Sequence, residues 1–422
     1  MNVAGSGARL DRDLMDIVGA AHVRPADVRD EIDGIRPHWV VAPGSISEAA
    51  AVLRVASREG LALAPRGGGT AMGLGNPPSR LDVVLETGRM NRVLAHEAGD
   101  LIVEAEAGAS LEDLQTIVRG SGQMLAIDSP HPHATLGGMV AANTSGARRF
   151  RYGTLRDLVI GLTIVLPDGT VARSGGRVVK NVAGYDLGKL FTGSLGTLGL
   201  ISQIIFRLHA VPPARALVEI DVDSIQAVGD VVQVLLHSPL VPSAIELSGP
   251  ATQRRINVLF EGTEAGVTEQ AQRACNLTAI SGRPSIAESA EDDLEPGGAG
   301  PAARVAIKIT CLPADVPATL TLIDAVTEKK GVDVEVWGQA ATAVLWVRLY
   351  GEMNQIAAVI LRLREAMAPG GGSVVVTEAP VDLKRLVDVW GPAGDALPLM
   401  WRMKERFDPL NVMNPGRFVG GI

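Results

Sequence analysis

Residues 61–70 read LALAPRGGGT, a short alternating apolar segment that runs directly into three consecutive glycines. The alternation predicts a β-strand, and the glycines predict a loop whose backbone N–H groups are not covered by side chains. Successive bare N–H groups can converge on an anion, and a pyrophosphate fits that description. A flexible turn is the alternative interpretation of the same glycines.

Two further glycine-rich segments favour the phosphate interpretation. Residues 129–157 (SPHPHATLGGMVAANTSGARRFRYGTLRD) are too poor in large apolar side chains to form core, which indicates a backbone that closely approaches something flat and bulky. Residues 193–208 (GSLGTLGLISQIIFRL) place a glycine loop before an apolar strand, which suits the far end of a long cofactor. Residues 5–10 (GSGARL) and 183–190 (AGYDLGKL) mimic a dinucleotide fingerprint and a P-loop, but both motifs are incomplete.

The segments around these loops predict an α+β domain. A helical apolar stripe starts at a proposed N-cap, Ser47, and stops at Gly60. A second helix follows a capping-box-like Ser110, and residues 156–176 predict two strands joined by a turn at 167–169.

After residue 211 the sequence loses its long glycine-rich loops and follows a doubled β-α-β-β-α pattern of predicted elements. Such a pattern predicts two ferredoxin-like units side by side, forming a mostly antiparallel sheet with helices on one face. A Gly-, Pro- and acid-rich stretch at 282–304 predicts a mobile surface loop between the two copies. The first copy is expected at strand 216–222, helix 225–236, strands 244–247 and 256–261, and helix 263–277; the second at strand 305–311, helix 316–328, strands 332–337 and 342–349, helix 353–368 and strand 373–377.

Composition restricts the class of partner. The 422 residues carry a formal net charge of −8, so nucleic acid and anionic membrane surfaces are not expected as main partners. Direct membrane insertion is not expected either. The most apolar stretches are shorter than the ~20 residues that span a bilayer. No secretory signal is visible, which predicts a cytoplasmic protein that reaches a membrane only through partner subunits. The two cysteines have no metal or redox spacing, so no metal site is expected.

The three glycine-rich segments, with residues 177–191 (RVVKNVAGYDLGKLF) and 407–418 (FDPLNVMNPGRF), resemble the PCMH-type (vanillyl-alcohol-oxidase-like) FAD-binding family. Within it, residues 175–199 are most similar to the FAD-binding E subunit of bacterial glycolate oxidase. The resemblance implies an α+β protein, a PCMH-type FAD-binding domain with a ferredoxin-like cap. The implied division is an N-terminal segment 1–39, an FAD-binding domain 40–211, a cap 212–385, and a return to the FAD-binding domain at 386–422.

The resemblance also assigns site residues. Relatives with covalent flavin commonly carry His after the glycine triplet, whereas Thr70 stands here, so noncovalent FAD is expected. The implied cofactor residues are Arg66, Gly67, Gly68, Gly69 and Thr70 around the pyrophosphate; Pro130, Thr135, Leu136, Gly137, Gly138, Thr144, Ser145 and Gly146 along pyrophosphate, ribityl chain and isoalloxazine; Gly199, Leu200 and Ile201 near the adenine; and Asn414 in the C-terminal return.

Catalytic residues are harder to place. Relatives that oxidise D-lactate or glycolate with their own cap carry an HGDGN-like histidine motif, but no histidine follows His237 here. His131 and His133 are the candidates for a base near the flavin. Alternatively, they only shape a proline-rich loop. Arg148, Arg149 and Arg151 either pair with a substrate carboxylate or form a basic face toward solvent or a partner.

These observations predict an enzyme, the FAD-binding subunit of a glycolate (2-hydroxyacid) oxidase or dehydrogenase complex that converts glycolate to glyoxylate. The expected partners are a second flavoprotein subunit and an iron–sulfur subunit. A self-sufficient FAD-dependent D-lactate-type dehydrogenase and a noncatalytic flavin-binding scaffold are the alternatives.

Overall fold

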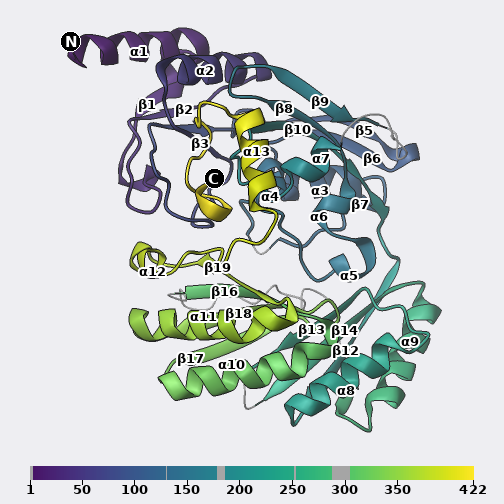
Figure 1. Ribbon diagram of the computed structural model, residues 1–422. Coiled ribbons are helices and arrows are strands. Elements are labelled where there is room, and N and C mark those ends of the chain that lie inside the picture. Colours follow the sequence, from purple (N-terminus) through teal and green to yellow (C-terminus); the bar gives the residue numbers. More distant parts are fainter. Residues whose placement is uncertain (1–2, 130, 178–185, 251–252, 288–304) are drawn as a thin grey trace.

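The computed structural model describes residues 3–129, 131–177, 186–250, 253–287 and 305–422. Two lobes are stacked on one another (Figure 1). The upper lobe combines the N-terminal half of the chain with the yellow C-terminal end, and the lower lobe holds helices α8 to α11 and the sheet that they cover. No helix in the described ranges combines the length and the apolar character that crossing a bilayer requires.

The first sheet of the upper lobe carries the glycine triplet at the end of one strand. Its order is β1-β2-β4-β3, with β2, β4 and β3 parallel. Helix α2 packs on it and begins after Ser45, not after Ser47 as expected, because the Ser45 side chain accepts the Glu48 N–H at 3.2 Å. Gly60 ends the helix in the left-handed region, as predicted. The bounds are α1 (Val3–Val18), β1 (Val23–Pro25), β2 (Trp39–Val41), α2 (Ile46–Glu59), β3 (Leu63–Arg66) and β4 (Val83–Glu86).

The second sheet of the upper lobe is antiparallel, in the order β5-β6-β10-β8-β9. The predicted hairpin is β8–β9, and the predicted strand after the third glycine loop is β10. Its core contains Leu114, Leu136 and Phe206, so Leu136 packs inside the lobe. The bounds are β5 (Val93–Glu97), β6 (Ile102–Glu106), α3 (Leu111–Arg119), β7 (Gln123–Met124), α4 (Leu136–Ala142), α5 (Arg149–Tyr152), α6 (Leu155–Leu158), β8 (Val159–Val165), β9 (Val171–Gly175), α7 (Leu187–Phe191), β10 (Leu200–Arg207) and β11 (His209–Ala210).

The lower lobe confirms the predicted doubled pattern. Eight antiparallel strands form one sheet in the order β15-β12-β14-β13-β17-β18-β16-β19, and α8 to α11 cover one face of it. The expected loop at 282–304 is wrong at its start, because β15 pairs with β12 and completes the first unit; residues 288–304 lie outside the described residues. The bounds are β12 (Ala214–Val222), α8 (Ile225–Leu236), β13 (Ala244–Ser248), β14 (Arg254–Gly262), α9 (Glu264–Thr278), β15 (Arg283–Ile286), β16 (Val305–Thr310), α10 (Val316–Lys330), β17 (Asp333–Gln339), β18 (Val344–Tyr350), α11 (Met353–Met367) and β19 (Ser373–Glu378).

The other face of this sheet is turned toward the upper lobe. Ala147 of the upper lobe packs against Leu217, Ala244 and Leu259, whose neighbours along the strands point into the helix-covered core. Beyond β19 the chain forms α12 (Val381–Leu386) and α13 (Leu397–Phe407) and returns to β3, where the Leu63 N–H donates to the Val412 carbonyl at 2.7 Å.

Candidate cofactor and active site

A cleft opens in the upper lobe where β3 ends, beside α4 and the loop that precedes β10. It contains about 760 Å³ of space not filled by atoms, open solvent included. The expected residues that line it are Arg66, Gly67, Gly68, Gly69, Thr70, Thr135, Gly137, Gly138, Gly199, Leu200, Ile201 and Asn414. Sequence reasoning missed Met72, Leu74, Thr87, Ala107, Leu195, Gly196 and Arg417, which also line it.

The glycine triplet at 67–69 lines the cleft, and two of its positions need glycine for different reasons. A Cβ on Gly67 would lie 2.0 Å from Thr135 Oγ1, so glycine is required there by close packing. Only Gly69 uses the left-handed region, with φ +76°. The backbone N–H groups of residues 67–70 make no hydrogen bond to any described residue. Four bare donors at the cleft are what an anionic ligand requires.

Two polar atoms in the cleft wall are buried without partners in the described part of the chain. Asn414 donates its amide Nδ2 to the Leu195 carbonyl at 2.7 Å, but its Oδ1 accepts nothing. Arg417 donates Nη2 to the Met72 and Leu74 carbonyls, but its Nε donates to nothing. An unsatisfied buried polar atom costs about 1–3 kcal/mol. A bound polar molecule that supplied these partners would remove that cost.

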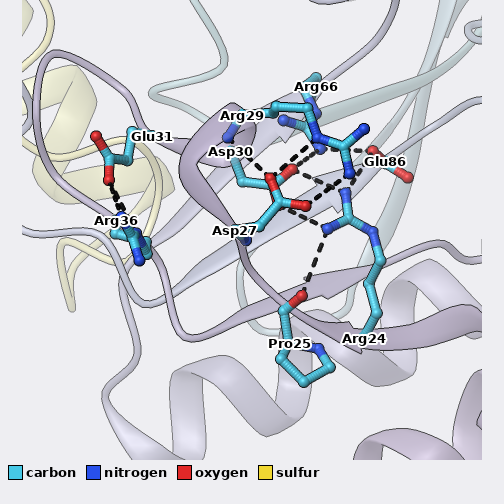
Figure 2. Close-up of polar contacts among 9 residues, drawn as sticks. All are labelled: Arg24, Pro25, Asp27, Arg29, Asp30, Glu31, Arg36, Arg66 and Glu86. Carbon is cyan, nitrogen blue, oxygen red and sulfur yellow. Dashed lines mark hydrogen bonds and ion pairs between the residues drawn. The ribbon is translucent and has the colours of Figure 1, made fainter.

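Arg66 lies at the entrance of the glycine loop, within an ion-pair network (Figure 2). Its Nη2 donates to Asp30 at 2.7 Å and to Glu86 at 2.6 Å. Arg24 binds the same buried Asp30 with both terminal nitrogens, at 2.6 and 2.8 Å, and this holds the pKa of that carboxyl well below its usual range. The Arg66 charge is therefore already compensated, and its guanidinium positions the end of β3. Sequence reasoning gave no signal for Asp30.

Several expected site residues lie outside the cleft. Leu136 is core, the Ser145 hydroxyl accepts the Leu155 N–H at 3.1 Å, and Gly146 packs on Asp128. Thr144 does not line the cleft, and Pro130 lies outside the described residues. His131 and His133 are exposed and do not line the cleft, so their catalytic role stays a prediction.

The three arginines of the segment 148–151 divide between two roles. Arg148 donates Nε to Glu261 of the cap at 3.2 Å and Nη1 to Asp128. Arg151 donates to the Glu261 carbonyl at 2.6 Å and to Ser243. Both residues therefore tie the upper lobe to the cap. Arg151 is also exposed to solvent, as the second alternative has it, whereas Arg148 is largely covered and lies within its ion pairs. Arg149 has no such partner among the described residues.

Glu246 of β13 is a buried acid on the face of the cap sheet that meets the upper lobe. Burial, with a smaller contribution from the Asp128 charge, raises the pKa of Glu246 to about 8. Within the described residues its carboxyl forms no ion pair. A carboxyl that stays protonated at neutral pH is a rare group at a lobe interface.

Known proteins match the chain along both lobes. A family model for the FAD binding domain matches residues 37–175, and one for the C-terminal domain of FAD-linked oxidases matches residues 251–418. Glycolate oxidase subunit GlcD of Bacillus subtilis is 24% identical over 416 residues, 90% of this chain and 88% of that protein. D-lactate dehydrogenase of Archaeoglobus fulgidus is 27% identical over 416 residues, 90% of this chain and 91% of that protein.

Among solved structures, p-cresol methylhydroxylase with substrate bound superposes with a TM-score of 0.77 at 16% identity. The superposition covers 98% of this chain and 96% of that one. At this level of identity the likeness concerns the fold, and it includes both lobes.

Proposed function

Because the chain belongs to the FAD-linked oxidoreductases with a PCMH-type FAD-binding domain, we propose that it is the FAD-bearing subunit of a complex that oxidises glycolate or a similar 2-hydroxyacid. Members of the family act on hydroxyacids such as glycolate and D-lactate. FAD is the cofactor, and the residues of the cleft fit it.

The observation that carries the proposal is the set of unpaired polar groups at the cleft. The bare N–H groups of residues 67–70 would hold the pyrophosphate, while Asn414 Oδ1 and Arg417 Nε would bind polar atoms along the cofactor. When bound, FAD supplies the ring that accepts the two electrons removed from the substrate. The residues of the cleft would orient the cofactor and surround it with a polar, partly enclosed wall.

The role as a subunit rests on what the cap carries. The cap carries a single histidine, His237, which is exposed at the end of α8, and no histidine follows it. The two described cysteines, Cys275 in α9 and Cys311 just after β16, are both free and form no cluster that could hold an iron–sulfur centre. A second flavoprotein and an iron–sulfur protein would supply the missing steps. The Bacillus subtilis relative is itself named as a glycolate oxidase subunit.

A self-sufficient D-lactate-type dehydrogenase is the second candidate. The Archaeoglobus fulgidus relative is named D-lactate dehydrogenase and aligns with 90% of this chain, cap included. Under this alternative the described cap would need a base other than histidine.

Dye-linked oxidation of glycolate and D-lactate distinguishes the candidates. The FAD-loaded chain is assayed alone, and again after purification from its own host together with the proteins that accompany it. We expect slow turnover alone, since the absence of a placed base forfeits roughly 10²–10⁴-fold, and full turnover in the complex. Rapid turnover by the isolated chain would favour the second candidate. A fully active complex whose subunit of this type contains no flavin would contradict both.

A further inference from the structure

Two segments of the cleft wall that are far apart in the sequence are joined to each other. Asn414 donates its side-chain Nδ2 to the Leu195 carbonyl at 2.7 Å, and both residues line the cleft. Leu195 belongs to the loop that precedes β10, whereas Asn414 follows α13. Both have a backbone in the left-handed region, with φ +52° and +47°. A leucine adopts this conformation rarely, and it persists only where the surrounding structure fixes it.

Lys404 of α13 fixes both segments. Its ammonium donates to the Thr197 carbonyl at 2.8 Å and to the Met413 carbonyl at 2.8 Å. These carbonyls stand within two residues of the joined pair. The third hydrogen bond of the ammonium, of 2.7 Å, goes to the Asp408 carboxylate. The side chains of Lys404 and Asp408 are 2% and 0% exposed, so the ion pair is buried.

The Asp408 carboxylate holds the C-terminal side of the same arrangement. Its Oδ2 also accepts the Met413 N–H at 2.7 Å, and its Oδ1 accepts the Val412 N–H at 3.0 Å. The N–H of Met413 is therefore bound to the acid of the pair and its carbonyl to the base. This sets the direction in which the next residue, Asn414, enters the cleft wall.

Lys404 acts on the cleft only through these segments. An ammonium has three N–H donors, and all three are used within the chain. Lys404 does not itself line the cleft. In α13, which the structure describes throughout, Lys404 alone is buried. Apolar side chains of similar size are often at least as stabilising as a buried ion pair, so stability alone gives no reason for a lysine at this position.

We propose that Lys404 is a positioning residue for FAD, whose ammonium holds Leu195 and Asn414 at the spacing that the cofactor requires. The Asn414 Oδ1, buried without a partner in the described part of the chain, is thereby kept in place for a polar group of FAD. The inference goes beyond the proposed reaction. It rests on the placement of FAD in this cleft and holds whichever substrate the flavin oxidises.

The affinity of the chain for FAD tests this role. Lys404→Met keeps the length of the side chain and removes the ammonium. Because this leaves the Asp408 carboxylate buried without its cation, a second variant combines Lys404→Met with Asp408→Asn and removes both charges. We expect each variant to raise the dissociation constant of FAD about tenfold or more. The measurement is the change in FAD fluorescence when protein freed of its flavin is titrated with FAD.

A buried ion pair in the cap provides the matched control. Arg254 of β14 donates to both carboxylate oxygens of Asp324 in α10, at 2.9 and 2.8 Å, and its side chain is 4% exposed. Neither residue lines the cleft. Arg254→Met should lower the melting temperature of the FAD-free chain, as Lys404→Met does, and leave the dissociation constant of FAD unchanged.

The double variant separates positioning from stability. We expect its melting temperature to recover relative to Lys404→Met, since no carboxylate is left buried without its cation, while its affinity for FAD stays low. An affinity that recovers together with the melting temperature would overturn the proposal, because the lysine would then be merely structural. Wild-type affinity in both variants, or an equal loss of affinity in Arg254→Met, would also overturn it. If the melting temperature does not recover, the comparison with Arg254→Met decides.

The test is independent of turnover, because no substrate is present. If Gly69→Asp, a change within the glycine loop, retains FAD, the placement of the cofactor fails and this inference fails with it. If Gly69→Asp loses FAD while both Lys404 variants keep the wild-type affinity, this inference alone fails. If the Lys404 variants lose affinity but no 2-hydroxyacid is oxidised, the positioning role stands and the proposed reaction fails.

Discussion

The backbone of Gly68 lies against the carbonyl oxygen of His133, so closely that a Cβ on Gly68 would come within 1.7 Å of that oxygen. The two glycine-rich segments that the sequence separates by more than sixty residues therefore meet as backbone against backbone. Any substitution at Gly68 must displace one of the segments before its charge or polarity matters. The position at which charge can be tested cleanly is Gly69, where the nearest atom to an added Cβ would be Arg66 Cδ at 3.9 Å.

Gly69→Asp should remove FAD from a folded chain, while Gly69→Asn should retain it. Asn and Asp are the side chains that best tolerate the left-handed backbone found here, φ +76°, and they have nearly the same shape. Two unit charges about 4 Å apart repel by about 1 kcal/mol in water and about 4 kcal/mol near a protein surface, which lowers the affinity for a pyrophosphate by a factor of roughly 5 to 1,000. The ratio of flavin to protein absorbance measures the result. Equal flavin content in the two variants would refute the assignment of this loop.

FAD should be released when the protein is denatured. Thr70 stands where covalent relatives commonly carry histidine, and it is exposed at the end of the glycine loop. After acid precipitation the whole of the flavin should be found in the supernatant as FAD. A yellow pellet would show a covalent bond from another residue.

Glu246→Gln should change how stability depends on pH. The pKa of Glu246 is raised to about 8 in the folded protein, from an ordinary value of 4.5, so the folded state holds the proton more tightly than the unfolded state. That stabilisation is complete below about pH 4.5, falls by up to about 1.4 kcal/mol per pH unit as pH rises, and is lost above about pH 8. Because glutamine cannot ionise, the variant should gain on the wild type across this window. The melting temperatures of wild type and variant are measured from about pH 5 to about pH 8. A difference between the two proteins that does not change with pH would contradict the account.

Arg148→Met should destabilise the contact between the lobes. Glu261 is fully buried, and losing the Arg148 side chain leaves it with Arg215 at 3.3 Å and the Tyr152 hydroxyl. Asp128 loses its ion pair and keeps the backbone N–H of residue 148, at 2.9 Å. Breaking a buried pair costs about 3–5 kcal/mol, and the remaining partners place the effect toward the lower end. The matched control is Arg177→Met, which removes the ion pairs of an exposed arginine with Glu97 and Glu104 and should cost at most about 1 kcal/mol. Urea unfolding of the two variants compares them, and equal midpoints would show that Arg148 does not hold the lobes.

The fold could be predicted where the signal is local. The apolar periodicities of the cap gave both ferredoxin-like units, because each helix and strand there is long and regular. Strand β15 was missed because Arg283 to Ile286 lies in a Gly- and Pro-rich segment, and only pairing with β12 makes it a strand. The N-cap was misplaced by two residues because Ser45 and Ser47 are equally good caps by type.

The site could be predicted only in part, for a related reason. The glycine loops are visible in the composition of their segments. Arg417 donates a hydrogen bond to the carbonyl of Met72, which lies 345 residues earlier in the chain. Arg66 donates to Asp30, which lies 36 residues earlier. Pairs so distant in the sequence leave no periodic pattern.

The measurement that tests the central claim most directly is anaerobic reduction of the bound FAD by a 2-hydroxyacid, followed in a single turnover by loss of the oxidised flavin absorbance. We expect glycolate or D-lactate to reduce the flavin, slowly in the isolated chain and rapidly in the complex, while acetate and ethanol leave it oxidised. Gly69→Asp should show no such signal, because it holds no flavin. Flavin that remains oxidised with every 2-hydroxyacid, in the isolated chain and in the complex alike, would contradict the account.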